Sequence, residues 1–272
     1  MISILGRDDM EKSKLKSFFK RLATAIVLVP VAVGCVLKGY PWIYILALLG
    51  AALLSWEWSD MVKNKKPSVY ACTYLFVASI ALLLASFWAG VIVLVLATVT
   101  VFLKAKEEDH RWLLTLGVPY IAIGLGSVLA IYSTYGSQIV LWYLCVIWGV
   151  DIGGYMFGCT IKGPKLAPKI SPNKTWAGLI GGMVLSVLIS WAVCWYYEAG
   201  IYTHIYSVLA AVLAVVAQIG DLIESSIKRY LGVKDSSNLI PGHGGIFDRI
   251  DGLIFAAPIA YILLTNLRLF VD

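Results

Sequence analysis

The chain has 272 residues, of which 60% are apolar and only 14% are charged. Soluble domains carry about 25% charged residues, so this composition excludes an ordinary soluble protein and indicates an integral membrane protein. The five cysteines form no Cys-x-x-Cys pair, so neither a disulfide framework nor a zinc site is expected. The net charge of +6 reflects membrane topology, and no nucleic-acid partner is expected.

Nine apolar segments approach the length of roughly 20 residues that a helix needs to cross a bilayer. Because unpaired backbone groups are costly in lipid, these segments should be regular helices. The sequence therefore predicts an all-α, polytopic membrane bundle of about nine transmembrane helices. They lie near residues 22–38, 41–56, 69–86, 87–104, 112–133, 138–158, 176–197, 205–223 and 252–270.

The positions of the basic residues predict the orientation, because cytoplasmic loops are enriched in Lys and Arg. With a cytoplasmic amino terminus, the loops on that side hold 20 of the 22 basic residues, and only Lys38 and Arg268 lie elsewhere. We expect a multi-pass protein of the cell's inner (plasma) membrane, with its active site facing the cytoplasm. An odd number of spans would leave the carboxyl terminus outside.

The first half of the chain offers few candidates for chemistry. Glu57 and Asp60 could be functional, but they adjoin three lysines, so we expect them in a solvated cytoplasmic turn, and residues 107–110 in another. We expect residues 1–137 to be a scaffold of transmembrane helices. Residues 138–272 should hold the catalytic helices and cytoplasmic loops, within one integrated membrane domain.

Asp151 is a lone carboxylate in an otherwise uncharged span. Such a residue costs about 2.5–3.5 kcal/mol on insertion scales, so it should face protein or water and have a partner. It could fix helix packing through a buried hydrogen bond, but its place near the cytoplasmic end favours a role in a site. Gly-x-x-x-Gly spacings in this span and in the next one, at Gly178–Gly182, predict a close approach of the two helices.

A basic loop follows this span and carries Lys162, Lys165, Lys169 and Lys174. Three prolines among the lysines discourage helix and keep the backbone extended. The lysines, with Ser171, Asn173 and Thr175, could donate to phosphate oxygens, and so could the first N–H groups of the next helix. Positive-inside charge alone would explain the lysines but not the prolines.

Residues 221–251 gather further charges between two apolar stretches. If the helix continues, Asp221, Glu224, Ser225 and Lys228 share one face, although a surface pair would also explain Glu224 and Lys228. Asp248 and Asp251 are likewise three residues apart. Carboxylates that converge from different helices suit Mg²⁺, which takes a few carboxylates plus substrate phosphates. Asp221, Asp248 and Asp251 are the candidate ligands for such a site.

The spacing of these residues resembles the phosphatidate cytidylyltransferase family, also called CDP-diacylglycerol synthase. The family signature runs Ser-x-apolar-Lys-Arg, four residues, Lys-Asp, then Pro-x-His-Gly-Gly-apolar-x-Asp-Arg-apolar-Asp. It is matched here by Ser225, Ile227, Lys228, Arg229, Lys234, Asp235, Pro241, His243, Gly244, Gly245, Ile246, Asp248, Arg249, Ile250 and Asp251. The upstream segments at Asp151–Tyr155 and 165–176 also resemble the family, whereas Ala177 stands where a Glu is expected.

The resemblance implies transfer of CMP from CTP to phosphatidate, with Mg²⁺ as cofactor and membrane lipids around the enzyme. It implies Asp221 and Asp248 as the ligands of Mg²⁺ and leaves open a second cation. A homodimer is one of the assembly states left open. The implied catalytic residues are Asp221, Asp248, Lys228, His243 and Asp251. The implied substrate-binding residues are Asp151, Lys165, Lys169, Ser171, Lys174, Glu224, Ser225, Arg229, Lys234, Asp235 and Arg249.

Two alternatives remain at this stage. A CTP-dependent enzyme of the same superfamily, such as a CDP-archaeol synthase or a lipid-alcohol kinase, would differ in the acceptor and not in the architecture. An ion-coupled transporter would place Asp151 and Asp221 near mid-membrane, between repeated or broken helices. The sequence has no convincing internal repeat, and its charges gather on the cytoplasmic side, so the transporter is the weaker alternative.

Overall fold

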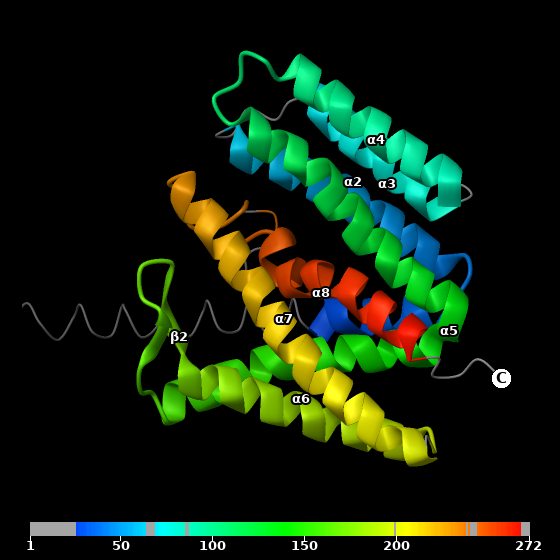
Figure 1. Cartoon of the computed structure of the whole chain (residues 1–272), viewed down its shortest axis with the longest axis vertical. Coiled ribbons are helices and arrows are strands. Elements are labelled where there is room, and N and C mark those ends of the chain that lie inside the picture. Colours follow the sequence, from blue (N-terminus) through cyan, green and yellow to red (C-terminus); the bar gives the residue numbers. More distant parts are fainter. Residues whose placement is uncertain are drawn as a thin grey trace, which may run out of the picture.

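The computed structural model describes residues 26–63, 69–84, 87–198, 200–237, 239 and 244–267. Most of these residues are helical, as predicted, and Figure 1 shows their arrangement. The labelled helices are α2 (Trp42–Val62), α3 (Val69–Leu84), α4 (Phe87–Lys104), α5 (Arg111–Thr160), α6 (Trp176–Tyr196), α7 (Thr203–Tyr230) and α8 (Phe247–Asn266). Residues Ile26–Lys38 are also helical, and a short 3-10 helix spans Gly200–Tyr202.

Four of the helices are long and apolar enough to cross a membrane, namely Trp42–Val62, Arg111–Thr160, Trp176–Tyr196 and Gly200–Tyr230. Many of their large apolar side chains face outward, among them Leu188 and Val208. An outward apolar surface of this kind suits a lipid environment. The count of about nine crossings and the cytoplasmic amino terminus stay predictions.

The 50-residue helix α5 contains two of the predicted spans, because its backbone leaves helical geometry at Gly136. There φ is 79° and ψ is −175°, a conformation that glycine adopts without the steric cost of a Cβ atom. The break lies between the predicted spans 112–133 and 138–158. The first half of α5 packs with α2, α3 and α4, the second half with α6 and α7, and α8 lies between the two groups (Figure 1).

Glycines bring the second half of α5 against α6, as their spacing predicted. A Cβ atom on Gly153 would lie 2.6 Å from the Gly181 carbonyl oxygen, and one on Gly178 would lie 2.8 Å from the Gly154 carbonyl oxygen. Only glycine allows the two backbones to approach so closely. This contact places Asp151 of α5 beside the start of α6.

The proline-containing basic loop forms a small antiparallel hairpin, a strand feature in an otherwise helical fold. Strand β1 (Lys165–Ala167) pairs with β2 (Ser171–Thr175). The sequence predicted extended backbone here but not the pairing. Thr175 ends the hairpin and caps α6, because its hydroxyl accepts a hydrogen bond of 3.0 Å from the Gly178 N–H. Arg229 Nε donates to the Ile170 carbonyl, 3.3 Å away, and so ties the hairpin to α7.

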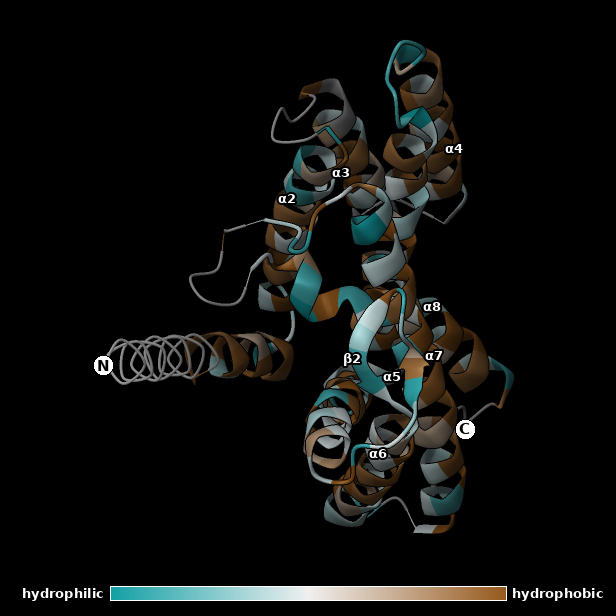
Figure 2. Cartoon of the chain, turned by 90° about the vertical axis from the view of Figure 1, so that its left-hand side faces the viewer, coloured by the Kyte–Doolittle hydropathy of each residue, from teal (hydrophilic) through white to brown (hydrophobic). Residues whose placement is uncertain are grey.

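Polar residues are unevenly distributed over the molecule. Figure 2 shows hydrophilic residues in the hairpin and in connections between helices, whereas the helices themselves are mostly hydrophobic. The hairpin, the end of α7 and the start of α8 therefore form one polar region beside apolar helices. This region contains the candidate site.

Candidate active site

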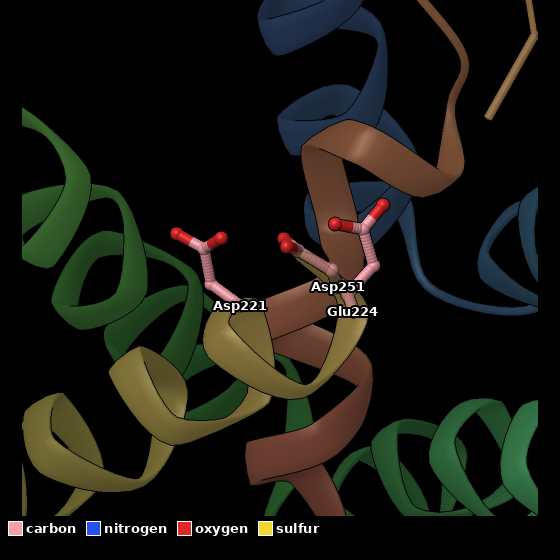
Figure 3. A group of neighbouring side chains, drawn as sticks. All are labelled: Asp221, Glu224 and Asp251. Atoms are coloured by element: carbon pink, nitrogen blue, oxygen red, sulfur yellow. The ribbon is translucent and has the colours of Figure 1, made fainter. Parts of the chain in front are cut away.

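Three carboxylates from two helices converge in the polar region. Asp221 and Glu224 on α7 and Asp251 on α8 each offer an oxygen atom, and these atoms all lie within 4.8 Å of one another. Figure 3 shows the three side chains directed to the same side of the two helices. The prediction that Asp221 and Glu224 share one face is confirmed, because α7 continues to Tyr230. Carboxylates at this separation can share one hard cation.

Asp248 is not in this group of carboxylates, although the sequence paired it with Asp221 as a metal ligand. Its oxygens accept hydrogen bonds from the Ser236 N–H at 3.0 and 3.1 Å and from the Gly245 N–H at 2.9 Å. Lys228 Nζ is 2.9 Å from Asp248 Oδ1. Asp248 therefore forms hydrogen bonds with the loop before α8, whereas Asp221 lies together with Glu224 and Asp251.

The hydrogen bonds around Asp248 favour its ionised form. Burial alone would raise the pKa of this carboxyl, but hydrogen bonds from Lys228 and from the Gly245 N–H outweigh it and hold the pKa below its ordinary value. Gly244 precedes Gly245, one of the donors to Asp248, and has a φ of +85°. A side chain at that position would be strained and would also approach Asp248 Oδ2.

Two lysines pair with the carboxylates of α7. Lys174 of β2 forms an ion pair with Asp221, and Lys228 Nζ lies 2.6 Å from Glu224 Oε2. The other oxygen, Glu224 Oε1, is buried and has no hydrogen-bond partner among the described residues. A buried carboxylate oxygen without a donor is costly unless a cation lies beside it.

A cavity of about 330 Å³ adjoins this cluster and is lined by α5, β2, α6, α7 and α8. Asp151, Asn173, Lys174, Asp221, Asp248, Arg249 and Asp251 all contribute to its wall. Glu224 also belongs to this group of charges through its contact with Lys228, which in turn contacts Asp248. A cation beside these carboxylates would favour their ionised forms.

The other described site residues are not in the wall of the cavity. Ser225 Oγ is 3.4 Å from Asp221 Oδ1, and Ser171 begins β2. Five further residues are exposed to solvent, on the hairpin and at or beyond the end of α7: Lys165, Lys169, Arg229, Lys234 and Asp235. His243 lies outside the described residues.

Glu57 of α2 overturns an expectation, because it is fully buried and does not lie in a solvated turn. Its carboxylate accepts hydrogen bonds from Ser237 Oγ at 2.6 Å, from the Ile246 N–H at 2.9 Å and from the Phe247 N–H at 2.7 Å. The prediction was wrong because α2 continues to Val62, so residue 57 lies within the helix and not after it. A carboxylate between two tryptophans, six positions before the first lysine, was the signal available in the sequence.

Known proteins resemble this chain over nearly its whole length. Residues 19–267 match the model of the cytidylyltransferase family. The chain is 32% identical over 270 residues to a phosphatidate cytidylyltransferase of Rickettsia felis, with 97% of this chain and 99% of that protein covered. It is 34% identical to the protein of the same name from Rickettsia bellii (97% and 98% covered) and 33% identical to that from Brucella suis (89% and 91% covered).

Proposed function

Because the chain belongs to the cytidylyltransferase family, we propose that it transfers CMP from CTP to phosphatidate and forms CDP-diacylglycerol and pyrophosphate. Relatives that match nearly the whole chain carry the name of this activity. The single observation of the structure that supports it most is the cluster of Asp221, Glu224 and Asp251 beside a cavity with cationic groups in its wall. A nucleoside triphosphate and a lipid phosphate both need such counter-charges.

The residues of the cluster fit a magnesium ion. Asp221, Glu224 and Asp251 would hold it, and the convergence of their oxygens and the unpartnered oxygen of Glu224 are the observations that favour a cation here. Mg²⁺ prefers carboxylate oxygens together with substrate phosphates. When bound, it would supply neutralisation of the charge on the triphosphate.

The reaction needs positioning and charge neutralisation more than covalent chemistry by the protein. An oxygen of the phosphatidate phosphate attacks the α-phosphorus of CTP and forms a new P–O bond. The bond from the α-phosphorus to the oxygen that bridges to the β-phosphorus breaks, and pyrophosphate leaves with that oxygen. Lys174 and Arg249 in the cavity wall bind the phosphate oxygens and stabilise the charge that develops on them.

The hairpin supplies further cations to the substrates. Lys165 and Lys169 are exposed on its surface, where they attract CTP and the anionic lipid headgroup without occupying the cavity. Lys174 lies nearer to the carboxylate cluster than these two lysines, because it pairs with Asp221. On binding of substrate, its ammonium transfers from that carboxylate to a phosphate oxygen.

The membrane placement follows from the same chemistry. CTP is a cytoplasmic solute, so the cavity faces the cytoplasm, and the lipid reaches it from the inner leaflet of the cell's inner membrane. The predicted orientation supports this placement, since it would put 20 of the 22 basic residues on the same side as the hairpin.

The test uses the purified protein in detergent with Mg²⁺, CTP and phosphatidate, and measures CDP-diacylglycerol and pyrophosphate. We expect both products in equal amounts, and neither when CTP or phosphatidate is omitted. Turnover of a lipid alcohol or an ether-lipid phosphate but not of phosphatidate would assign the chain to another acceptor. Ion flux in liposomes without consumption of CTP would contradict an enzymatic role.

A further inference from the structure

We propose that Glu57 is a positioning residue for the reaction: from α2, outside the expected catalytic half, it fixes the start of α8 and so places Asp248 and Asp251. This inference rests on the proposed function, since it assigns Glu57 a role in the geometry of that site. Among the described residues, the hydrogen-bond donors to the Glu57 carboxylate lie 180 to 190 positions away in the sequence.

Glu57 supplies the cap that α8 lacks in its own sequence. The first N–H groups of a helix have no partner within the helix, and Ile246 at the N-cap position offers no side-chain hydrogen bond. Both oxygens of Glu57 accept there, Oε1 from the Ile246 N–H and Oε2 from the Phe247 N–H. A carboxylate at this end of a helix also interacts favourably with the helix dipole.

Trp58, the residue after Glu57, also contacts the start of α8, through its aromatic ring. The ring centroids of Trp58 and Phe247 are 5.3 Å apart in an edge-to-face arrangement, and Tyr120 of α5 packs on both rings. Trp58 is itself fixed by a hydrogen bond of 3.0 Å from Nε1 to the Leu113 carbonyl. Two consecutive residues of α2 therefore hold Phe247 in place. Glu57 binds the N–H of Phe247, and Trp58 packs against its ring.

Gly245 connects these contacts of α2 to the site. Gly245 donates its N–H to Asp248, while the next two N–H groups along the chain point to Glu57. A Cβ atom on Gly245 would lie 2.8 and 2.9 Å from the two carboxylate oxygens of Glu57, so the loop lies directly against this side chain. A shift of the loop would move Asp248 and, one helical turn later, Asp251.

The chemistry at position 57 requires a carboxylate of this length. Among the described residues, three donors contact the Glu57 carboxylate, so a Gln would turn its NH₂ group toward at least one N–H or O–H donor. An Asp is shorter by one methylene and cannot reach both Ser237 and Phe247 without movement of the backbone. Misplacement of a catalytic group by about 1 Å can cost about 100-fold in rate.

The experiment compares Glu57→Gln and Glu57→Asp with the unchanged protein by steady-state kinetics and by hydrogen exchange of residues 244–252. We expect kcat to fall about 10- to 100-fold in Glu57→Gln, with the KM for CTP changed much less and with faster exchange in that segment. Glu57→Asp should recover part of kcat. The matched control is Glu108→Gln, which removes an ion pair of 2.5 Å with Lys63 at the end of the same helix and should leave both readouts unchanged.

Four outcomes separate the hypotheses. A folded Glu57→Gln protein with normal kcat and normal exchange overturns the inference, and so does a lower melting temperature with unchanged kcat, which indicates a merely structural role. If substitutions at 57 prevent folding, Ser237→Ala removes one donor and should lower kcat in the same direction; an unchanged kcat there counts against the proposal. Retained turnover in Asp221→Asn and Asp251→Asn would instead refute the proposed site itself.

Discussion

Lys228 Nζ lies 2.9 Å from Asp248 Oδ1, and this ion pair joins the last turns of α7 to the first turn of α8. The same ammonium is 2.6 Å from Glu224. The exposed fractions of the three side chains are only 13%, 6% and 2%. Buried charges persist only where they are paired, so Lys228 sets the spacing of the two helices that carry the carboxylate cluster.

Replacement of Lys228 by Met should therefore destabilise the protein as well as the site. It leaves two buried carboxylates without their cation, a change that typically costs about 3–5 kcal/mol. We expect a lower midpoint of thermal unfolding in detergent and loss of CDP-diacylglycerol formation. Lys234→Met is the control, because Lys234 is exposed; equal midpoints for the two variants would contradict this role of Lys228.

Binding of Mg²⁺ by the carboxylate cluster should appear in stability as well as in activity. A ligand at 100 times its Kd stabilises the state that binds it by about 2.7 kcal/mol. We expect Mg²⁺ to raise the unfolding midpoint of the unchanged protein, EDTA to reverse this rise, and Asp251→Asn to abolish both the rise and turnover. Asp109→Asn, an exposed substitution distant from the cavity, should retain both.

The same measurement decides between two ligand sets. The sequence paired Asp221 with Asp248, whereas the structure groups Asp221 with Glu224 and Asp251. If Asp248→Asn loses the Mg²⁺-dependent rise while Asp251→Asn keeps it, the pairing expected from sequence is the correct one.

Much of the fold was accessible from sequence, because lipid imposes a simple rule on it. Each apolar segment had to be a helix, and each of the nine predicted segments does contain helical residues. The close approach of α5 and α6 was also predictable, since small residues four apart leave room for a neighbouring backbone. The hairpin was predictable only as extended chain, because prolines restrict the backbone but do not specify the partner strand.

The site was predictable in its residue types but not in its pairings. Spacing along α7 places Asp221 and Glu224 on one face, which the structure confirms. No local pattern reveals that the loop before α8 turns its N–H groups toward Asp248, because these N–H groups belong to residues 236 and 245, which lie apart in the sequence. Glu57 was missed for the same reason, since its partners lie 180 or more positions away.

Lys174 should contribute more to substrate binding than the other hairpin lysines. It lies in the cavity wall and pairs with Asp221, whereas Lys165 is exposed. We expect Lys174→Gln to raise the KM for CTP by about 10- to 150-fold, as loss of a charge-assisted hydrogen bond of about 1.5–3 kcal/mol implies, and Lys165→Gln to raise it less. Steady-state kinetics with Lys106→Gln as an exposed control would check this order. A larger effect at position 165 would assign the exposed face of the hairpin as the main phosphate contact.

The glycine contact between α5 and α6 should be as important to the site as the charged residues are. In Gly153→Ala the new methyl group would lie 2.6 Å from the Gly181 carbonyl oxygen and 2.9 Å from Gly182 Cα, both of them backbone atoms. The helices must separate to admit it, and overpacking of this kind costs about 1–3 kcal/mol. The separation would also move Asp151 and Lys174 apart across the cavity, so turnover should fall further than the loss of stability explains.

The control for that substitution is Gly34→Ala, in the helix of residues 26–38, where a Cβ atom would meet nothing within 4 Å. There the change should be neutral or should stabilise the protein by up to about 1 kcal/mol, because alanine has the higher helix propensity. Thermal unfolding and turnover measured on both variants separate the effect of close packing from that of losing a glycine. Equal behaviour of the two would mean that the α5–α6 contact does not hold the cavity in shape.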